Sequence, residues 1–399
     1  MQPNNSDFIP FNLPSIGEEE IAEVTAVLRS GWLTTGPKTQ QFEREFTDWV
    51  GAPHALAVNS GTAAMHLALA ALDIGPGDEV ITTPLTFCST ISVILHTGAT
   101  PVLADVGPDG NIDPSEIEKR ITPQTRAILP VHLAGLACDM DAIWDIAARH
   151  SLRVIEDAAH AAGTRYKGAL IGDTSNPHRR SDVVAFSFYA TKNLTTGEGG
   201  MATCHDPALA SRMRRLCLHG ISKDAWNRYS EKGNWFYQVV ETGFKYNLTD
   251  IQSAIGIHQL RKQPGFIEAR TRIAQRFHQA FEAIDALELP PGHLDPGHCW
   301  HLYTLRLKPQ YSPISRADFI DQLRARGIGA SVHFIPVPLH PFFAEHADKP
   351  ENHCPCALNI YERSISLPLY PLMPDASVDR VVEAVISIAS QPHPLPTGR

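Results

Sequence analysis

The alternation of short apolar runs with helical stretches is the feature that most limits how this chain can fold. Apolar runs of strand length occur at residues 54–58, 79–82, 101–104, 126–132, 153–156, 182–187 and 201–204. Residues 62–72 and 140–149, between them, have helical periodicity. The runs hardly alternate with polar residues, which indicates strands covered on both faces. We therefore expect an α/β fold with a large, mostly parallel seven-stranded sheet flanked by helices.

Further elements are expected before and after the segment that forms this sheet. A first helix is expected to begin at Ser15, because residues 15–18 have the spacing of a capping box and the apolar residues from Ile21 to Leu28 fall on one face. After residue 258 the pattern changes, which predicts a large domain at 1–258 and a smaller C-terminal α+β domain at 259–399. The elements expected in the smaller domain are helices at 268–287, 316–326 and 377–388 and a strand at 301–307.

Charge and composition exclude several classes of protein. With 34 Lys and Arg against 43 Asp and Glu, the net charge of −9 argues against a sequence-independent nucleic-acid binder. Residues 1–5 lack the basic start of a signal peptide, and no run of about 18 apolar residues occurs to span a membrane. The seven cysteines form no C-x-x-C pair and the histidines show no metal-ligand spacing, so we expect a cytoplasmic protein without a metal site.

The first strand leads into a turn that favours an anion. Residues 59–65 place a glycine and two hydroxyl side chains at a helix start, where free N–H groups and the helix dipole attract phosphate. No P-loop lysine follows, which excludes a triphosphate loop. Taken alone, an ordinary helix cap by Ser60 or Gly61 is the simpler interpretation.

Two other strand ends carry ionisable residues. Asp157 comes directly after the fifth strand, where a buried carboxylate needs a partner such as a protonated heterocyclic nitrogen. Lys192 lies between an apolar strand and a glycine-rich turn, and desolvation there lowers the pKa of an amine and makes it a nucleophile for Schiff-base chemistry. The alternatives are a helix cap for Asp157 and a surface loop for Lys192.

Together these three strand ends predict a site for pyridoxal 5′-phosphate (PLP). A lysine holds the aldehyde of PLP, a carboxylate keeps its pyridine nitrogen protonated, and a helix start binds its phosphate. Phe87, just after the second strand, could stack on the ring, although a core aromatic is the alternative.

The chain resembles the DegT-type nucleotide-sugar aminotransferases, which are PLP enzymes of the aspartate aminotransferase fold (fold type I). The resemblance runs from about residue 11 to about residue 388. It rests on motifs in the same order, at residues 31–37, 59–65, 86–90, 156–161, 187–200 and 243–252.

The resemblance implies which residues hold the cofactor. Lys192 matches the Schiff-base lysine, and Asp157 matches the partner of the pyridine nitrogen. Thr62, Ala63 and Ser187 match phosphate-binding positions.

Further positions are implied around the ring and the substrate. Phe87 matches the aromatic that stacks on the ring, and His160 matches a position beside it. Asn247 matches an asparagine that reaches the neighbouring subunit's phosphate, which implies a homodimer. Thr34 and His333 match positions near the sugar substrate.

The resemblance also implies a reaction. L-glutamate would give its amino group to a keto sugar on a nucleoside diphosphate, a 4-keto sugar of UDP or dTDP, for polysaccharide or lipopolysaccharide biosynthesis. Two alternatives stay open: transamination of a free keto-inositol or keto-sugar, and a non-catalytic regulatory protein of the same fold. Tyr189, where many members have histidine, and the long loop at 173–181 depart from the family pattern and leave the sugar open.

Overall fold

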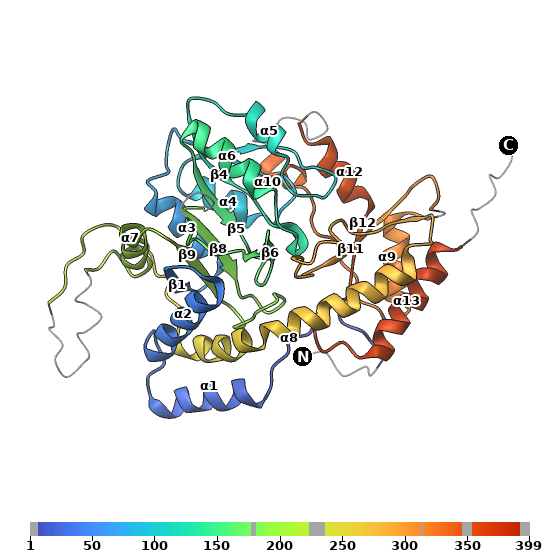
Figure 1. The fold of residues 1–399 in the computed structure, drawn as a ribbon, viewed down its shortest axis with the longest axis horizontal. Helices are drawn as coiled ribbons and strands as arrows, with labels where there is room; N and C mark the ends of the chain where they lie inside the picture. The colour runs from blue at the N-terminus through green and yellow to red at the C-terminus, as the bar shows by residue number, and fades with distance from the viewer. Residues whose placement is uncertain (1–6, 177–180, 223–235, 313, 345–352, 392–399) are drawn as a thin grey trace.

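The computed structural model describes residues 7–176, 181–222, 236–312, 314–344 and 353–391. The expected α/β fold is confirmed by a seven-stranded sheet with the order β1-β9-β8-β5-β4-β2-β3 (Figure 1). The strands are β1 His54–Val58, β2 Glu79–Thr82, β3 Thr100–Leu103, β4 Thr125–Leu129, β5 Arg153–Asp157, β8 Val183–Ser187 and β9 Gly200–Cys204. Only the two pairs made by β9 are antiparallel. The run expected at 126–132 ends as a strand at Leu129, because the next residue, Pro130, has no N–H for the ladder.

Helices cover both faces of this sheet. They are α2 Pro37–Val50, α3 Gly61–Ala71, α4 Ser89–His96, α5 Pro114–Lys119, α6 Met140–His150 and α7 Pro207–Cys217. Helix α5 has a well-formed start: Asp113 is the N-cap, its carboxylate accepts from the N–H of Ser115, and Pro114 opens the helix. Short elements between the strands are η1 Leu133–Gly135 and the hairpin β6 Arg165–Tyr166 with β7 Ala169–Leu170.

The first helix differs from the expectation. Helix α1 runs over Glu18–Ser30, and its N-cap is Gly17, whose N–H donates to the Glu20 carboxylate at 2.8 Å, instead of a capping box beginning at Ser15. The expected apolar face is buried only in part: Val27 is buried, whereas Ile21 and Leu28 are 51% and 54% exposed. Polar contacts hold α1 against a long helix later in the chain, where buried Glu20 accepts from Gln259 and Lys262.

That long helix, α8, covers Asp250–Phe281, so the helix expected at 268–287 begins well before its predicted start. Thr249 caps it in a reciprocal box with Gln252, and Pro264 lies inside it. Figure 1 shows α8 passing from α1 and α2 to α13. The predicted boundary between residues 258 and 259 therefore falls within one continuous helix, and the division into two domains stays a prediction.

The C-terminal part has its own antiparallel sheet and core. The sheet consists of β10 Leu287–Glu288, β11 Tyr303–Leu307 and β12 Ser364–Leu367. Around it are η3 Val337–Leu339 and helices α9 Arg316–Ala325, α10 Pro341–Ala344, α12 Pro355–Arg363 and α13 Asp375–Ala389. Its hydrophobic cluster includes the second half of α8 and also Ile9 from the start of the chain. In the described parts of the chain, no helix is both long and apolar enough to cross a membrane.

The sheet directions place the predicted site residues at one edge. Strands β2, β4, β5 and β8 run parallel to one another, so their carboxyl ends meet at the same side of the sheet. β1 runs in the same direction, since both β1 and β8 are antiparallel to β9. Ligands of open α/β sheets bind beyond this edge.

Candidate active site

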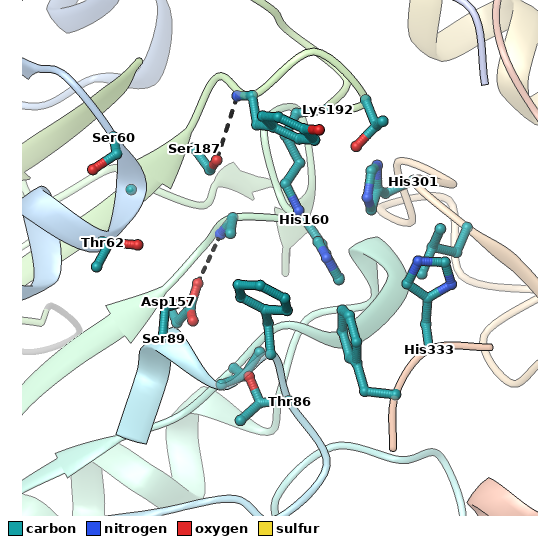
Figure 2. A pocket seen from close by; sticks show the side chains of 18 of the residues that line it. Ser60, Thr62, Thr86, Ser89, Asp157, His160, Ser187, Lys192, His301 and His333 are labelled. Carbon is teal, nitrogen blue, oxygen red and sulfur yellow. Dashed lines mark hydrogen bonds between the residues drawn. The ribbon is translucent and has the colours of Figure 1, made fainter. Parts of the chain in front are cut away.

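A cavity of about 450 Å³ lies at this edge of the sheet, between the strand ends and the C-terminal part. Figure 2 shows Ser60 and Thr62 on one side of it and His301 and His333 on the opposite side, with Asp157 and Lys192 between them. The cavity therefore brings residues from both halves of the chain together.

Lys192 lies in a tight turn after β8. Its N–H donates to the carbonyl of Tyr189 at 2.9 Å, and the turn folds back on Phe188, whose N–H donates to the carbonyl of Gly199 at 2.8 Å. The Lys192 side chain lines the cavity, and burial lowers its pKa to about 8, although the nearby Asp157 charge acts in the opposite direction. Lys192 therefore lies in the cavity wall and not on an open surface loop, and the lowered pKa favours the neutral form of its amine.

Asp157 closes β5, with its carboxyl in the cavity wall. One oxygen accepts from the N–H of Ala159 at 3.1 Å and the other from the hydroxyl of Thr90 at 2.9 Å. Asp157 is 4% exposed, and burial raises its pKa. Among the described residues it has no ion pair, so a bound cation such as a protonated ring nitrogen would complete its environment.

The turn after β1 forms a cradle at the start of α3. Ser60 caps the helix by accepting from the N–H of Ala63 at 3.0 Å, and the first N–H groups of a helix have no partner within it. A Cβ added at Gly61 would lie 2.9 Å from the Cβ of Ser187, so glycine lets the helix start approach the end of β8. The side chains of Thr62 and Ser187 line the cavity here, in keeping with a phosphate site.

Phe87 is not a core aromatic. It is 58% exposed, and its ring lies 6.1 Å from that of Phe334, which comes from the C-terminal part and also lines the cavity. Two aromatic side chains from distant segments thus border the space beyond Asp157.

Three histidines form the wall on the C-terminal side. The rings of His160 and His301 lie 4.3 Å apart, and Nδ1 of His333 lies 2.9 Å from the hydroxyl of Ser366. Burial lowers the pKa of His333 to about 4 and the pKa values of His160 and His301 well below the usual range. This wall therefore presents neutral imidazoles at neutral pH.

The predicted site residues fall into two groups. Those that line the cavity are Thr62, Phe87, Asp157, His160, Ser187, Lys192 and His333. Those that do not line it are Thr34, Ala63 and Asn247. Ala63 is buried beneath the cradle, its N–H used by Ser60, while the Asn247 amide donates to the hydroxyl of Thr35 at 2.7 Å.

Sequence reasoning missed Thr90, His301 and Phe334. Thr90 lies inside the motif at 86–90, after a strand end that the parallel sheet brings near Asp157, so its hydroxyl could have been considered as a partner of that carboxyl. His301 and Phe334 carried no local signal, because they reach the cavity only through the packing of the C-terminal part on the sheet edge.

PLP fits these residues, because an amine, an unpaired buried carboxyl and a helix start surround one cavity at the carboxyl edge of the sheet. Fold and site together define a PLP-dependent transferase of fold type I. Residues 14–386 match the DegT/DnrJ/EryC1/StrS aminotransferase family, and the chain belongs to that family. The chain is therefore a PLP-dependent sugar aminotransferase. This confirms the resemblance found in the sequence and favours an enzyme over the alternative of a non-catalytic regulatory protein.

Similar proteins agree with this assignment. The chain is 52% identical over 390 residues to the spore coat polysaccharide biosynthesis protein SpsC of Bacillus subtilis (strain 168), covering 97% of this chain and 99% of SpsC. The putative sugar aminotransferase Spr1654 from Streptococcus pneumoniae, in its PMP-form, has a TM-score of 0.88 at 35% identity, covering 96% of this chain and 99% of that one. Its PLP-form matches with the same TM-score of 0.88 at 34% identity, covering 96% of this chain and 98% of that one. Helicobacter pylori PseC, an aminotransferase involved in the biosynthesis of pseudoaminic acid, has a TM-score of 0.87 at 28% identity, covering 96% and 99%.

Proposed function

We propose that this enzyme transfers an amino group from L-glutamate to a keto sugar attached to a nucleoside diphosphate. The acceptor is a 4-keto sugar of UDP or dTDP, and the products are an amino sugar and 2-oxoglutarate. The observation that carries the proposal is one cavity holding Lys192 and Asp157 opposite a wall of neutral imidazoles. Such a wall can exchange hydrogen bonds with sugar hydroxyls without favouring an ion.

Each cofactor residue has a physical role in this proposal. When bound, PLP supplies an aldehyde that reacts with primary amines and a ring that takes up electrons. Lys192 holds the cofactor, and its amine takes the proton from the donor carbon and later returns it, which its lowered pKa permits. Asp157 keeps a proton on the ring nitrogen. Thr62 and Ser187 bind the phosphate with the start of α3.

The remaining residues would hold the ring and the sugar. Phe87 has an exposed ring at the cavity, as a stacking aromatic requires, and Ala63 fixes the cradle through its N–H. His160 and His333 offer imidazoles beside the ring and the sugar, respectively.

Thr34 and Asn247 support the proposal of a homodimer. Neither lines the cavity of its own chain, yet the two lie together, because the Asn247 amide donates to Thr35, the residue after Thr34. The adjoining Trp32 and Leu33 are 42% and 46% exposed, which suits a surface covered by a second copy. We propose that this segment completes the active site of the neighbouring subunit.

Subunit mixing tests the shared site. Mixed dimers of Lys192→Ala and Asn247→Ala chains contain one site free of both changes, so mixing the two inactive variants should restore activity. Lack of recovery, with mixed dimers shown by mass spectrometry, would contradict a shared site.

A substrate screen tests the reaction. The enzyme is incubated with PLP, L-glutamate and a panel of UDP- and dTDP-linked keto sugars, including 3-keto sugars, and products are read by mass. We expect an amino sugar nucleotide together with an equal amount of 2-oxoglutarate. Free keto-inositol and keto-sugars serve as the comparison. Turnover of these alone, without competition by UDP or dTDP, would favour the alternative of a free sugar acceptor.

A further inference from the structure

The carboxyl of Asp157 is held by a chain of two threonine hydroxyls at the start of α4. Oγ1 of Thr90 lies 2.9 Å from Oδ2 of Asp157, and Oγ1 of Thr86 lies 2.8 Å from Oγ1 of Thr90. Thr86, Thr90 and Asp157 are 2%, 0% and 4% exposed. Because these side chains are buried, bulk water does not replace a lost partner.

The proton positions in this chain follow from the chemistry of the groups. An ionised carboxylate only accepts, so Thr90 donates to Asp157. A hydroxyl has a single proton, so Thr86 must donate to Thr90. Both hydrogen bonds therefore point toward Asp157, starting from Thr86 in the cavity wall. This arrangement favours the ionised form of Asp157.

The other groups around Asp157 do not replace this donor. The opposite carboxyl oxygen accepts from the N–H of Ala159, and the charges that act on Asp157 are those of Lys192 and His132. In the part of the chain that the structure describes, neither forms an ion pair with it. The Thr90 hydroxyl is therefore a main source of stabilisation for one of the two oxygens.

We propose that Thr90 is a positioning residue of this aminotransferase: its hydroxyl fixes the orientation and the ionised state in which Asp157 pairs with the ring nitrogen of PLP. Thr86 orients Thr90 by donating to it. The inference rests on the role proposed above for Asp157, and it adds a residue that does not touch the cofactor.

Three variants of the full-length holoenzyme test the proposal. Thr90→Val removes the hydroxyl at nearly constant shape, and Thr90→Ser keeps it. Thr82→Val is a matched control, because it removes another fully buried hydroxyl, which donates to the carbonyl of Leu129 at 2.7 Å. For each variant we would measure the dissociation constant of PLP across a pH series and the thermal unfolding of the apo form.

We expect Thr90→Val to weaken PLP binding about tenfold, the usual effect of losing a hydrogen bond to a charged group. Loss of affinity on acidification should also set in at a higher pH, because the carboxyl is harder to keep ionised without its donor. Thr90→Ser should stay close to wild type. Thr82→Val should lower the unfolding temperature without changing the pH dependence of PLP binding.

The outcomes separate this inference from the proposed function. If Thr90→Val binds PLP with wild-type affinity and pH dependence while Asp157→Asn does not, the inference is overturned and the role of Asp157 stands. If Asp157→Asn also binds like wild type, both fall. Should Thr90→Val not fold, Thr86→Val removes the donor to Thr90, and an unchanged pH dependence in that variant would equally overturn the inference.

Discussion

The imidazoles of His160 and His301 lie 4.3 Å apart in opposite tautomers. Nδ1 of His160 accepts from the N–H of Ala134, which leaves its proton on Nε2. Nδ1 of His301 faces the carbonyl oxygen of the Asn193 amide, whose nitrogen donates to Cys299, so His301 carries its proton on Nδ1. The pair therefore offers one donor and one acceptor.

We predict that neither ring takes up a proton near pH 6.5, where a free histidine does, because burial lowers both pKa values. Nitrogen chemical shifts of the imidazoles, assigned with His160→Asn and His301→Asn, would report neutral rings of opposite tautomer at pH 6. A midpoint near 6.5 for either ring would contradict the prediction.

The lowered pKa of Lys192 predicts how PLP attaches to the apoenzyme. The neutral amine is the reactive form, and its fraction rises as the pH passes the pKa of about 8. The rate of PLP attachment, followed by absorbance in rapid mixing, should therefore rise with a midpoint near pH 8. A rate that keeps rising toward pH 10 would indicate an ordinary lysine.

Replacing Lys192 should abolish both turnover and covalent attachment. Lys192→Ala leaves no amine in the described wall of the cavity to hold the cofactor, so borohydride treatment should label the wild-type peptide and not the variant. Lys167→Ala is the control, since Lys167 is a surface residue paired with Asp141. Wild-type turnover by Lys192→Ala would refute the assignment of the lysine.

The cluster of Phe46, Phe186 and Phe188 should contribute strongly to the stability of the folded protein. Phe46 is fully buried, and its ring lies 5.1 Å from Phe186 and 5.8 Å from Phe188. Phe46→Ala should lower the free energy of unfolding by about 3–5 kcal/mol in urea titration, because it leaves a cavity. Phe342→Ala, at a side chain 64% exposed, is the matched control and should change little. Equal effects of the two would contradict this account of the core.

The large sheet could be predicted because its strands are continuous apolar runs. Other elements, such as β12 and the start of α8, have weaker sequence patterns. Strand β12 contains Ser364 and Ser366, both fully buried, and the hydroxyl of Ser364 is satisfied by the carbonyl of Ile360. Such a strand has no continuous apolar run. The early start of α8 was missed although Thr249 and Gln252 form a capping box, because Pro264 resembles a helix boundary.

The residues of the site also fall into those that could be predicted from the sequence and those that could not. Asp157, Ser187 and Lys192 follow strand ends, and the topology of a parallel sheet brings strand ends together. The contact between His301 and Asn193 joins residues 108 positions apart, and it depends on how the C-terminal part packs against the sheet. Local sequence patterns do not contain that information.

Pro264 gives α8 a weak point between the two groups of residues that form the cavity. Proline cannot donate to the carbonyl of Leu260, so the hydrogen-bond ladder has a gap there, while the turns on either side are anchored in separate hydrophobic clusters. Bending is cheapest at such a gap. Any bending of α8 is therefore expected at Pro264, between the half that packs with Phe42 and Phe46 and the half that packs in the C-terminal core.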